Sequence, residues 1–134
     1  MKDMELINAA LGAAERAYAP YSGFFVGAAL LCKSGAVYTG CNVENSSYGA
    51  ACCAERTALF KAVSEGEREF AAIAIVGGKG GKVRAFCPPC GICRQVLSEF
   101  AEGDFLVLLY DGENVRKLSL AELLPHSFAK NNLE

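Results

Sequence analysis

Apolar residues between positions 4 and 18 recur at intervals of three and four, which is the spacing of one face of a helix. The residues of this face are Ile7, Ala10, Leu11, Ala14 and Tyr18. Proline cannot continue a helix, so Pro20 marks an end to the pattern. The sequence therefore predicts an amphipathic helix over 4–18 that packs on a core.

The next two apolar segments predict a β-hairpin. Residues 25–32 are apolar almost without interruption, and a second segment, 37–43, follows the turn-forming residues 33–35. A glycine lies within each segment, at Gly27 and Gly40. Such glycines indicate either bulges or places where another backbone comes close.

The remaining chain alternates between helical and strand patterns. Helices are expected over 53–64, 90–101 and 120–124, and strands over 71–76, 105–110 and, more weakly, 115–118. The glycine-rich stretch 77–81 predicts a flexible connection, and it lacks the spacing of a phosphate-binding loop. Alternating strands and helices predict an α/β fold, with a mixed sheet of about five strands flanked by helices in one domain over 1–134.

Composition narrows the classes of partner. A chain of 134 residues suits one domain with its own core. The net charge of -2 and the lack of a basic stripe argue against nucleic acid but are compatible with a small uncharged substrate. No apolar stretch is long enough for a membrane span, and residues 1–11 do not read as a signal peptide. We therefore expect a cytoplasmic protein with no membrane partner.

The cysteines point to metal chemistry. The chain has seven, an odd number, and Cys52 and Cys53 are adjacent, which suits metal ligands and buried thiols better than disulfides. Cys90 and Cys93 are three apart near a predicted helix start, so they fall on one face. Cys53 starts another helix, and the partial positive charge of a helix N-terminus lowers a thiol pKa. Three thiolates can bind zinc and leave the fourth position for water, as catalytic sites do.

Two neighbours of Cys53 have candidate roles. Bound zinc lowers the pKa of water to about 7, and Glu55 could then move the proton. Arg56 could offset the excess negative charge of three thiolates. Residues two apart on a helix point roughly 200° apart, so Cys53 and Glu55 can meet at one ion only if the helix begins at or just before Cys53.

Spacing alone leaves other interpretations open. Cys87 extends the motif to C-x₂-C-x₂-C, which resembles part of a ferredoxin cluster site, with Cys52 or Cys53 as a fourth ligand. Four cysteines could also close a structural zinc site, or all seven thiols could be buried. Cys32 and Cys41 lie in apolar segments and are expected to be core thiols, whereas Cys52 and Cys87 have no clear assignment.

Several segments, in order, resemble one family. They are Tyr18-Ala19-Pro20-Tyr21-Ser22, Val26-Gly27-Ala28-Ala29-Leu30, Gly40-Cys41-Asn42-Val43-Glu44-Asn45, Cys53-Ala54-Glu55-Arg56-Thr57-Ala58, Pro89-Cys90-Gly91-Ile92-Cys93-Arg94-Gln95-Val96 and Glu122-Leu123-Leu124-Pro125. The C-x-E and P-C-x-x-C elements form the zinc deaminase signature. Along nearly its whole length the chain resembles the homotetrameric, zinc-dependent cytidine deaminases. The resemblance implies their three-layer fold.

The resemblance also implies the reaction of these deaminases, which is the hydrolysis of cytidine and deoxycytidine to uridine or deoxyuridine and ammonia in pyrimidine salvage. Cys53, Cys90 and Cys93 would hold one Zn²⁺ per subunit. Zinc-bound hydroxide would attack C4 of the cytosine ring, with Glu55 as the proton shuttle. A related aminohydrolase that acts on a cytosine-containing antibiotic is the nearest alternative.

The resemblance further implies a substrate pocket shared between the subunits of a homotetramer. Its members would be Asn42 and Glu44 at the ribose hydroxyls, Phe24 stacked near the base, the backbone of Ala54 at the base, and Ser46, Tyr48 and Phe128 from neighbouring subunits. Taken alone, Asn42 and Glu44 would be ordinary loop residues, and Phe24 an ordinary core aromatic. The chain departs from the family pattern at Pro88, where serine is usual, and at Ser46, where alanine is usual.

Overall fold

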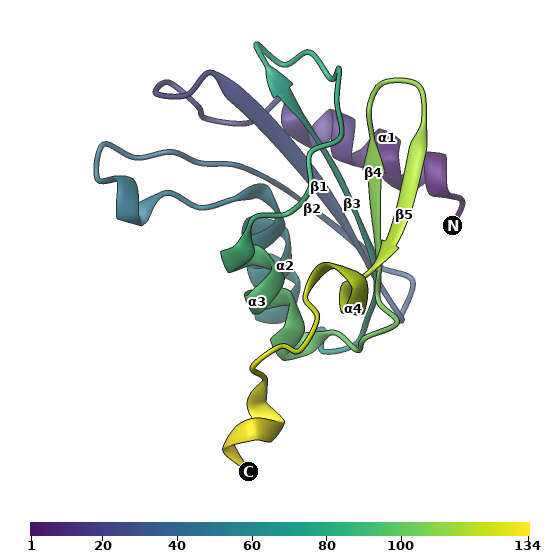
Figure 1. Cartoon of the computed structure of the whole chain (residues 1–134). Coiled ribbons are helices and arrows are strands. Elements are labelled where there is room, and N and C mark those ends of the chain that lie inside the picture. Colours follow the sequence, from purple (N-terminus) through teal and green to yellow (C-terminus); the bar gives the residue numbers. More distant parts are fainter.

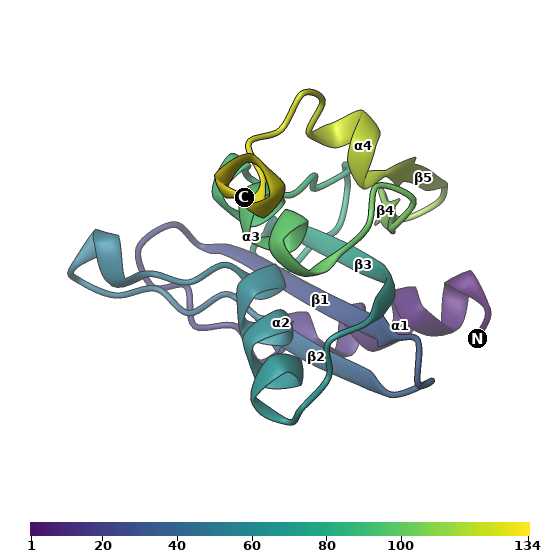
Figure 2. The ribbon, with the colours of Figure 1, turned by 90° about the horizontal axis from the view of Figure 1, so that it is seen from below.

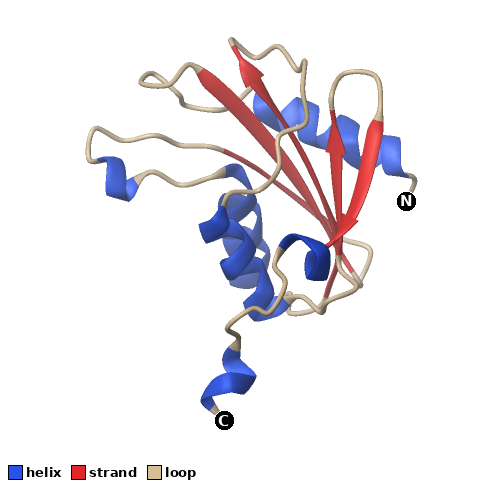
Figure 3. Ribbon diagram, in the orientation of Figure 1, coloured by secondary structure: helices blue, strands red, loops and turns tan.

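A five-stranded sheet runs through the protein, with helices on both of its faces (Figures 1 and 3). The computed structural model describes all residues, 1–134. The helices are α1 (Asp3–Ala14), α2 (Ala54–Ser64), α3 (Gly91–Phe100) and α4 (Leu120–Leu123), with short 3₁₀ helices at Tyr48–Ala50 and Lys130–Leu133. The strands are β1 (Phe24–Cys32), β2 (Val37–Cys41), β3 (Phe70–Lys79), β4 (Leu106–Tyr110) and β5 (Val115–Ser119).

The sheet is mixed, as the sequence predicts. Its strand order is β2-β1-β3-β4-β5. β1 pairs antiparallel with β2 and β3, β3 pairs parallel with β4, and β4 pairs antiparallel with β5. The parallel pair is joined through α3, because parallel neighbours need a crossover connection. The three-layer α/β fold and the hairpin of β1 and β2 are therefore confirmed.

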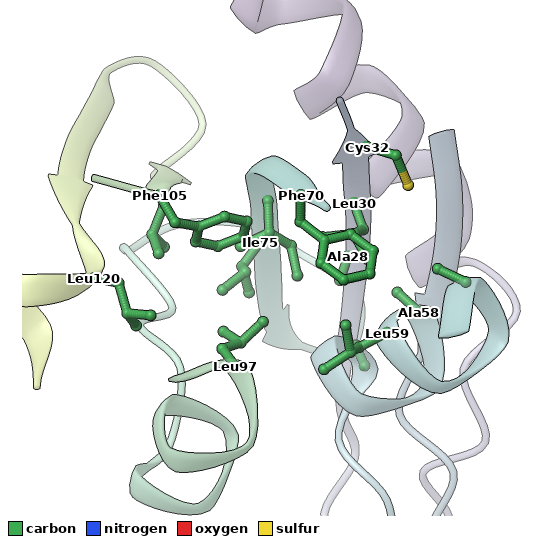
Figure 4. Close-up of a cluster of buried hydrophobic side chains, with 14 of the residues drawn as sticks. Ala28, Leu30, Cys32, Ala58, Leu59, Phe70, Ile75, Leu97, Phe105 and Leu120 are labelled. Atoms are coloured by element: carbon green, nitrogen blue, oxygen red, sulfur yellow. The ribbon is translucent and has the colours of Figure 1, made fainter. Parts of the chain in front are cut away.

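Both faces of the sheet are buried, which explains the uninterrupted apolar runs. Helix α1 covers one face, and α2, α3 and α4 lie on the other (Figure 2). Neighbouring residues of a strand point to opposite faces, so Ile73 and Ile75 belong to the cluster under α2 and α3, whereas Ala74 faces α1. The larger cluster brings Leu59 of α2 and Leu97 of α3 together over the sheet (Figure 4).

Both hairpin glycines mark close backbone approaches. A Cβ on Gly27 would lie 2.0 Å from the carbonyl oxygen of Ala10 in α1, and a Cβ on Gly40 would lie 2.4 Å from the backbone nitrogen of Ala58 in α2. The helices thus rest directly on the strands on either face. The contact at Gly40 fixes the position of α2, and with it the position of Cys53 at its start.

The first helix ends four residues earlier than predicted. It ends at Ala14, and its buried face is Leu6, Ile7, Ala10 and Ala13. Tyr18, predicted to belong to this face, is instead 56% exposed. Its backbone joins the segment after β2: the N–H of Tyr18 donates to the carbonyl of Asn42 (3.0 Å), and its carbonyl accepts from the N–H of Glu44 (2.8 Å).

The prediction of a flexible connection over 77–81 is wrong for its first three residues. Gly77 and Gly78 are buried in β3, where they pair with Val26 and Phe25 of β1. A Cβ on Gly78 would lie 1.8 Å from the carbonyl oxygen of Lys82, so the glycine makes room for the returning chain. None of the helices combines the length and hydropathy needed to cross a bilayer.

Candidate metal centre

Two helices begin at the candidate metal centre, and each has a cysteine as its N-cap. Cys53 caps α2 and Cys90 caps α3, and both have extended backbone rather than helical backbone. Cys93 follows in the first turn of α3, and its N–H donates to the Cys90 sulfur at 3.4 Å. Since a helix N-terminus carries a partial positive charge, this arrangement favours thiolates.

The three sulfurs have the spacing that tetrahedral zinc requires. Zinc–sulfur bonds of about 2.3 Å place the sulfurs of such a site about 3.8 Å apart. The Sγ atoms of Cys53 and Cys90 are 3.7 Å apart, and those of Cys53, Cys90 and Cys93 all lie within 4.8 Å of one another. The donor set therefore fits a zinc ion with these three protein ligands.

No fourth thiol joins the group. Cys87 is not among the clustered cysteines and lies beside Gly77; burial raises its pKa to about 11, with the charges of Glu55 and Cys53 acting in the same direction. Burial also raises the pKa of Cys52. An electron-transfer cluster and a closed four-cysteine zinc site both need a fourth thiolate, so the geometry favours an open, three-ligand site.

Arg56 lies against the sulfurs. Its Nη2 donates to the Cys53 sulfur at 3.4 Å, while its Nε is buried without a hydrogen-bond partner. A hydrogen bond from the Cys93 thiol and then one from Arg56 lower the pKa of Cys53 to about 5. The pKa of Cys93 is raised in turn, because that thiol keeps its proton toward Cys53. At neutral pH the cluster already carries negative charge beside the guanidinium.

Glu55 is a buried carboxyl next to the thiols. It is only 4% exposed, and burial raises its pKa to about 7, with the charge of Cys53 acting in the same direction. Helix α2 begins at Ala54, so Cys53 precedes it and does not obey helical spacing relative to Glu55. The helix therefore begins one residue later than the predicted start at or just before Cys53, and Cys53 lies beside Glu55 as the N-cap instead of as a helical residue.

Asn42 and Glu44 continue the chain beyond β2, and both are fixed by hydrogen bonds. The Asn42 side chain accepts from the N–H of Val26 (2.9 Å) and donates to the carbonyl of Phe24 (2.8 Å), so it extends the pairing of β2 with β1. Glu44 accepts from the N–H groups of Tyr21 (2.9 Å) and Ser22 (3.1 Å). Its pKa is lowered, chiefly by the hydroxyl of Ser22.

A cavity of about 310 Å³ connects these residues with Cys53. Its lining residues are Asn42, Glu44, Tyr48, Gly49, Ala51, Cys52, Cys53, Arg56 and Ile92. A second cavity of about 270 Å³ adjoins it at Glu44 and Tyr48. Small-molecule pockets commonly begin at about 300 Å³, so the space suits a ligand of nucleoside size.

Of the three residues assigned to neighbouring subunits, Tyr48 lines this cavity of its own chain, whereas Ser46 and Phe128 do not. Ser46 is exposed, Tyr48 is 76% exposed, and Phe128 is 62% exposed. Ser46 and Tyr48 belong to a loop that projects from the body of the domain (Figure 1). Phe128 lies in the C-terminal tail, where its carbonyl accepts from Gln95. The pocket of a single chain is therefore open on this side.

Sequence reasoning missed the turn that supports Glu44. Tyr21 and Ser22 hold its carboxylate, although their segment carried no assigned role. A local signal was present, because the Ser22 hydroxyl accepts from the N–H of Phe24, two residues on, in a serine turn. What no local pattern shows is that this turn lies against a carboxylate 22 residues further along the chain.

Comparison with known proteins now adds to this geometry. The family model for the cytidine and deoxycytidylate deaminase zinc-binding region matches residues 1–109. The chain is 48% identical to the cytidine deaminase of Sporosarcina psychrophila over 96% of this chain and 93% of that protein. It is 49% identical to the cytidine deaminase of Halalkalibacterium halodurans, covering 96% and 95% of the two chains.

A solved structure agrees with the fold over the same length. The crystal structure of cytidine deaminase from Burkholderia pseudomallei matches with a TM-score of 0.88 and 50% identity, covering 96% of this chain and all of that one. With three clustered cysteines as its candidate zinc ligands, the chain belongs to the cytidine deaminase family of zinc-dependent hydrolases.

Proposed function

We propose that the protein hydrolyses cytidine and deoxycytidine to uridine or deoxyuridine and ammonia, in pyrimidine salvage. The observation that carries the proposal is the buried carboxyl of Glu55 beside three clustered thiols at two helix N-termini. The adjoining cavity of about 310 Å³ supports a small nucleoside as the substrate. The relatives named above are cytidine deaminases, which supports the same reaction.

Cys53, Cys90 and Cys93 would hold one Zn²⁺, which when bound supplies a water of lowered pKa as the nucleophile. Glu55 moves the protons. It accepts one from the attacking water and passes it to N3 of the ring. It then takes the proton of the hydroxyl that is now on C4 and delivers it to the amino group, so that the C4–N bond breaks, the C4 carbonyl forms and ammonia departs. A carboxyl with a pKa of about 7 suits this exchange, because it can both accept and release a proton near neutral pH.

Residues around the cavity would hold the nucleoside. Asn42 and Glu44 bind the sugar hydroxyls, the backbone of Ala54 contacts the base, and the ring of Phe24 stacks near it. Ala54 occupies the first turn of α2, where backbone N–H groups have no partner within the helix. Phe24, at 39% exposed, presents an aromatic ring at the start of β1, at the same end of the sheet as Asn42.

We further propose a homotetramer in which neighbouring subunits complete each pocket. Ser46, Tyr48 and Phe128 would be the residues contributed across subunits. Tyr48 lines the cavity and is 76% exposed, so a neighbouring subunit could cover its ring, which supports this arrangement. Reduced thiols are needed for the metal site, and all seven cysteines are free, which supports a cytoplasmic location. No nucleic-acid partner is proposed for a chain with a net charge of -2.

The direct test is to incubate the zinc-loaded protein with cytidine and deoxycytidine and to measure uridine, deoxyuridine and ammonia. We expect turnover of both, with one zinc bound per chain. Glu55→Gln should retain the zinc and lose nearly all turnover, because it removes the proton transfer but no ligand. A cytosine-containing antibiotic forms a parallel arm. Zinc-loaded protein that turns over the antibiotic but neither nucleoside would contradict the proposed substrate.

A further inference from the structure

The Glu44 carboxylate has almost no free hydrogen-bonding capacity. An ionised carboxylate offers about four acceptor sites on two oxygens. The N–H groups of Tyr21 and Ser22 both donate to Oε1, at 2.9 and 3.1 Å, and the Ser22 hydroxyl donates to Oε2 at 2.5 Å. One acceptor site remains, and it is on Oε2, the oxygen that Ser22 holds.

The Ser22 hydroxyl uses its only proton in this arrangement. A hydroxyl has one proton to donate, and that proton goes to Glu44. Its oxygen accepts from the N–H of Phe24 at 3.0 Å. One side chain therefore connects the carboxylate with the start of β1, where the aromatic ring of Phe24 begins the strand.

The turn that carries Ser22 is anchored on both sides. The Gly23 N–H donates to the carbonyl of Ala19 (2.9 Å), which closes the turn. From β3, the Lys79 ammonium donates to the carbonyl of Ser22 (2.6 Å), and the Gly80 N–H donates to the carbonyl of Gly23 (2.8 Å). The hydroxyl is thus presented from a fixed backbone.

Two backbone donors alone would not fix the carboxylate. Both bind Oε1, so the carboxylate could still rotate about that oxygen and carry Oε2 away from the cavity. The Ser22 hydroxyl is the group that fixes Oε2. It is also the largest cause of the lowered pKa of Glu44, with the Lys79 charge contributing in the same direction, which keeps the carboxylate ionised.

We propose that Ser22 is a positioning residue for nucleoside binding: its hydroxyl orients the Glu44 carboxylate so that the one open acceptor site on Oε2 receives a hydroxyl of the substrate's sugar. The inference rests on the proposed function, because it assigns Glu44 to the sugar. Ser22 itself does not touch the nucleoside. Its effect should therefore depend on whether the substrate carries a 2′- or 3′-hydroxyl on the sugar ring for Glu44 to receive.

The test compares the wild type with Ser22→Ala on cytidine and on 2′,3′-dideoxycytidine, which lacks both ring hydroxyls. On cytidine, we expect KM to rise about tenfold with kcat changed much less, the size of losing one hydrogen bond to a charged group. On the dideoxynucleoside, we expect kcat/KM to be nearly the same for both proteins. Ser22→Thr keeps the hydroxyl and should restore KM.

Ser34→Ala is the matched control. Ser34 makes the same kind of contact, with its hydroxyl donating to the Glu67 carboxylate (3.0 Å) and accepting from the N–H of Ala36 (3.3 Å). It lies in the turn between β1 and β2, at the other end of β1 from Ser22, so the control should leave KM unchanged. Ser22→Cys keeps the side chain's size with a weak donor, and it replaces Ser22→Ala if that variant does not fold.

The outcomes distinguish failure of the positioning role of Ser22 from failure of the proposed reaction. An unchanged KM in Ser22→Ala, or an equal loss on cytidine and dideoxycytidine, would overturn the positioning role while leaving the reaction intact. Wild-type protein that deaminates none of these nucleosides would overturn the proposed function and this inference together. A penalty confined to substrates with a 2′- or 3′-hydroxyl, with rescue by Ser22→Thr, supports both.

Discussion

Gly40→Ala tests how strictly the packing of α2 on β2 sets the metal site. The added Cβ would lie 2.4 Å from the Ala58 nitrogen and 2.6 Å from the Ala54 carbonyl oxygen, whereas ordinary contacts are 3.4–4 Å. Both atoms belong to the backbone of α2, so the clash cannot be relieved by turning a side chain. The helix must move outward by about 1 Å, the difference between 2.4 and 3.4 Å.

That movement has two measurable consequences. Overpacking that forces backbone to shift costs about 1–3 kcal/mol of folding free energy. Zinc sites tolerate only about 0.2 Å in ligand distances, and Cys53 would move with α2 relative to Cys90 and Cys93. We therefore expect the melting temperature to fall by about 5–10 °C and the zinc affinity to fall as well.

Chemical and thermal unfolding at fixed protein concentration measure the loss of stability, and competition with a chromophoric chelator measures the loss of zinc affinity. Gly12→Ala is the control, because nothing lies within 4 Å of its added Cβ and it lies inside α1. Replacing glycine by alanine within a helix normally stabilises it, by about 0.5–1 kcal/mol. If Gly40→Ala kept both the melting temperature and the zinc affinity of the wild type, the reasoning would be refuted.

Three further predictions concern the metal and its neighbours. Arg56→Gln should raise the pKa of Cys53, so zinc affinity should fall most at acidic pH, where protons compete for the thiolate; chelator competition at several pH values measures this. Removal of zinc should lower the melting temperature, because an ion at 1,000 times its Kd stabilises the folded state by about 4 kcal/mol; an unchanged melting curve in chelator would count against a bound metal. In metal-free protein, the raised pKa of Glu55 means that the folded state holds a proton released on unfolding between pH 4.5 and about 7. As the pH rises through that window, the contribution of Glu55 to folding stability should fall by up to about 3 kcal/mol. Urea titrations at several pH values should therefore show a flatter pH dependence of the free energy of unfolding for Glu55→Gln than for the wild type.

Much of the architecture was readable from the sequence because burial on both faces leaves a clear pattern. The apolar runs of β1 and β3 and the capping box at Ser119 and Glu122 identify their elements directly. The end of α1 was not readable, since Ala17 and Tyr18 fit a helix locally. The segment after β2 draws the Tyr18 backbone into bridging hydrogen bonds instead, which is a tertiary effect.

Part of the candidate site was likewise predictable from the sequence, and part was not. Cys53, Cys90 and Cys93 were predicted to meet, and their sulfurs do cluster. Their spacing could not reveal whether Cys87 joins them, because that depends on where the loop before α3 places its thiol. The support of Glu44 by Ser22 was also hidden, since it forms between segments that are distant in sequence.

The candidate ligands lie at the beginnings of α2 and α3, so the far ends of both helices are remote from the chemistry. Helix α2 extends about 16 Å from Cys53 to Ser64 at 1.5 Å per residue, and α3 similarly leads away to Phe100. The connections 65–69 and 101–104 beyond those ends are therefore suitable places to insert a peptide tag or a fluorescent reporter. An enzyme of only 134 residues would in this way offer two sites for labelling that leave its metal ligands in place.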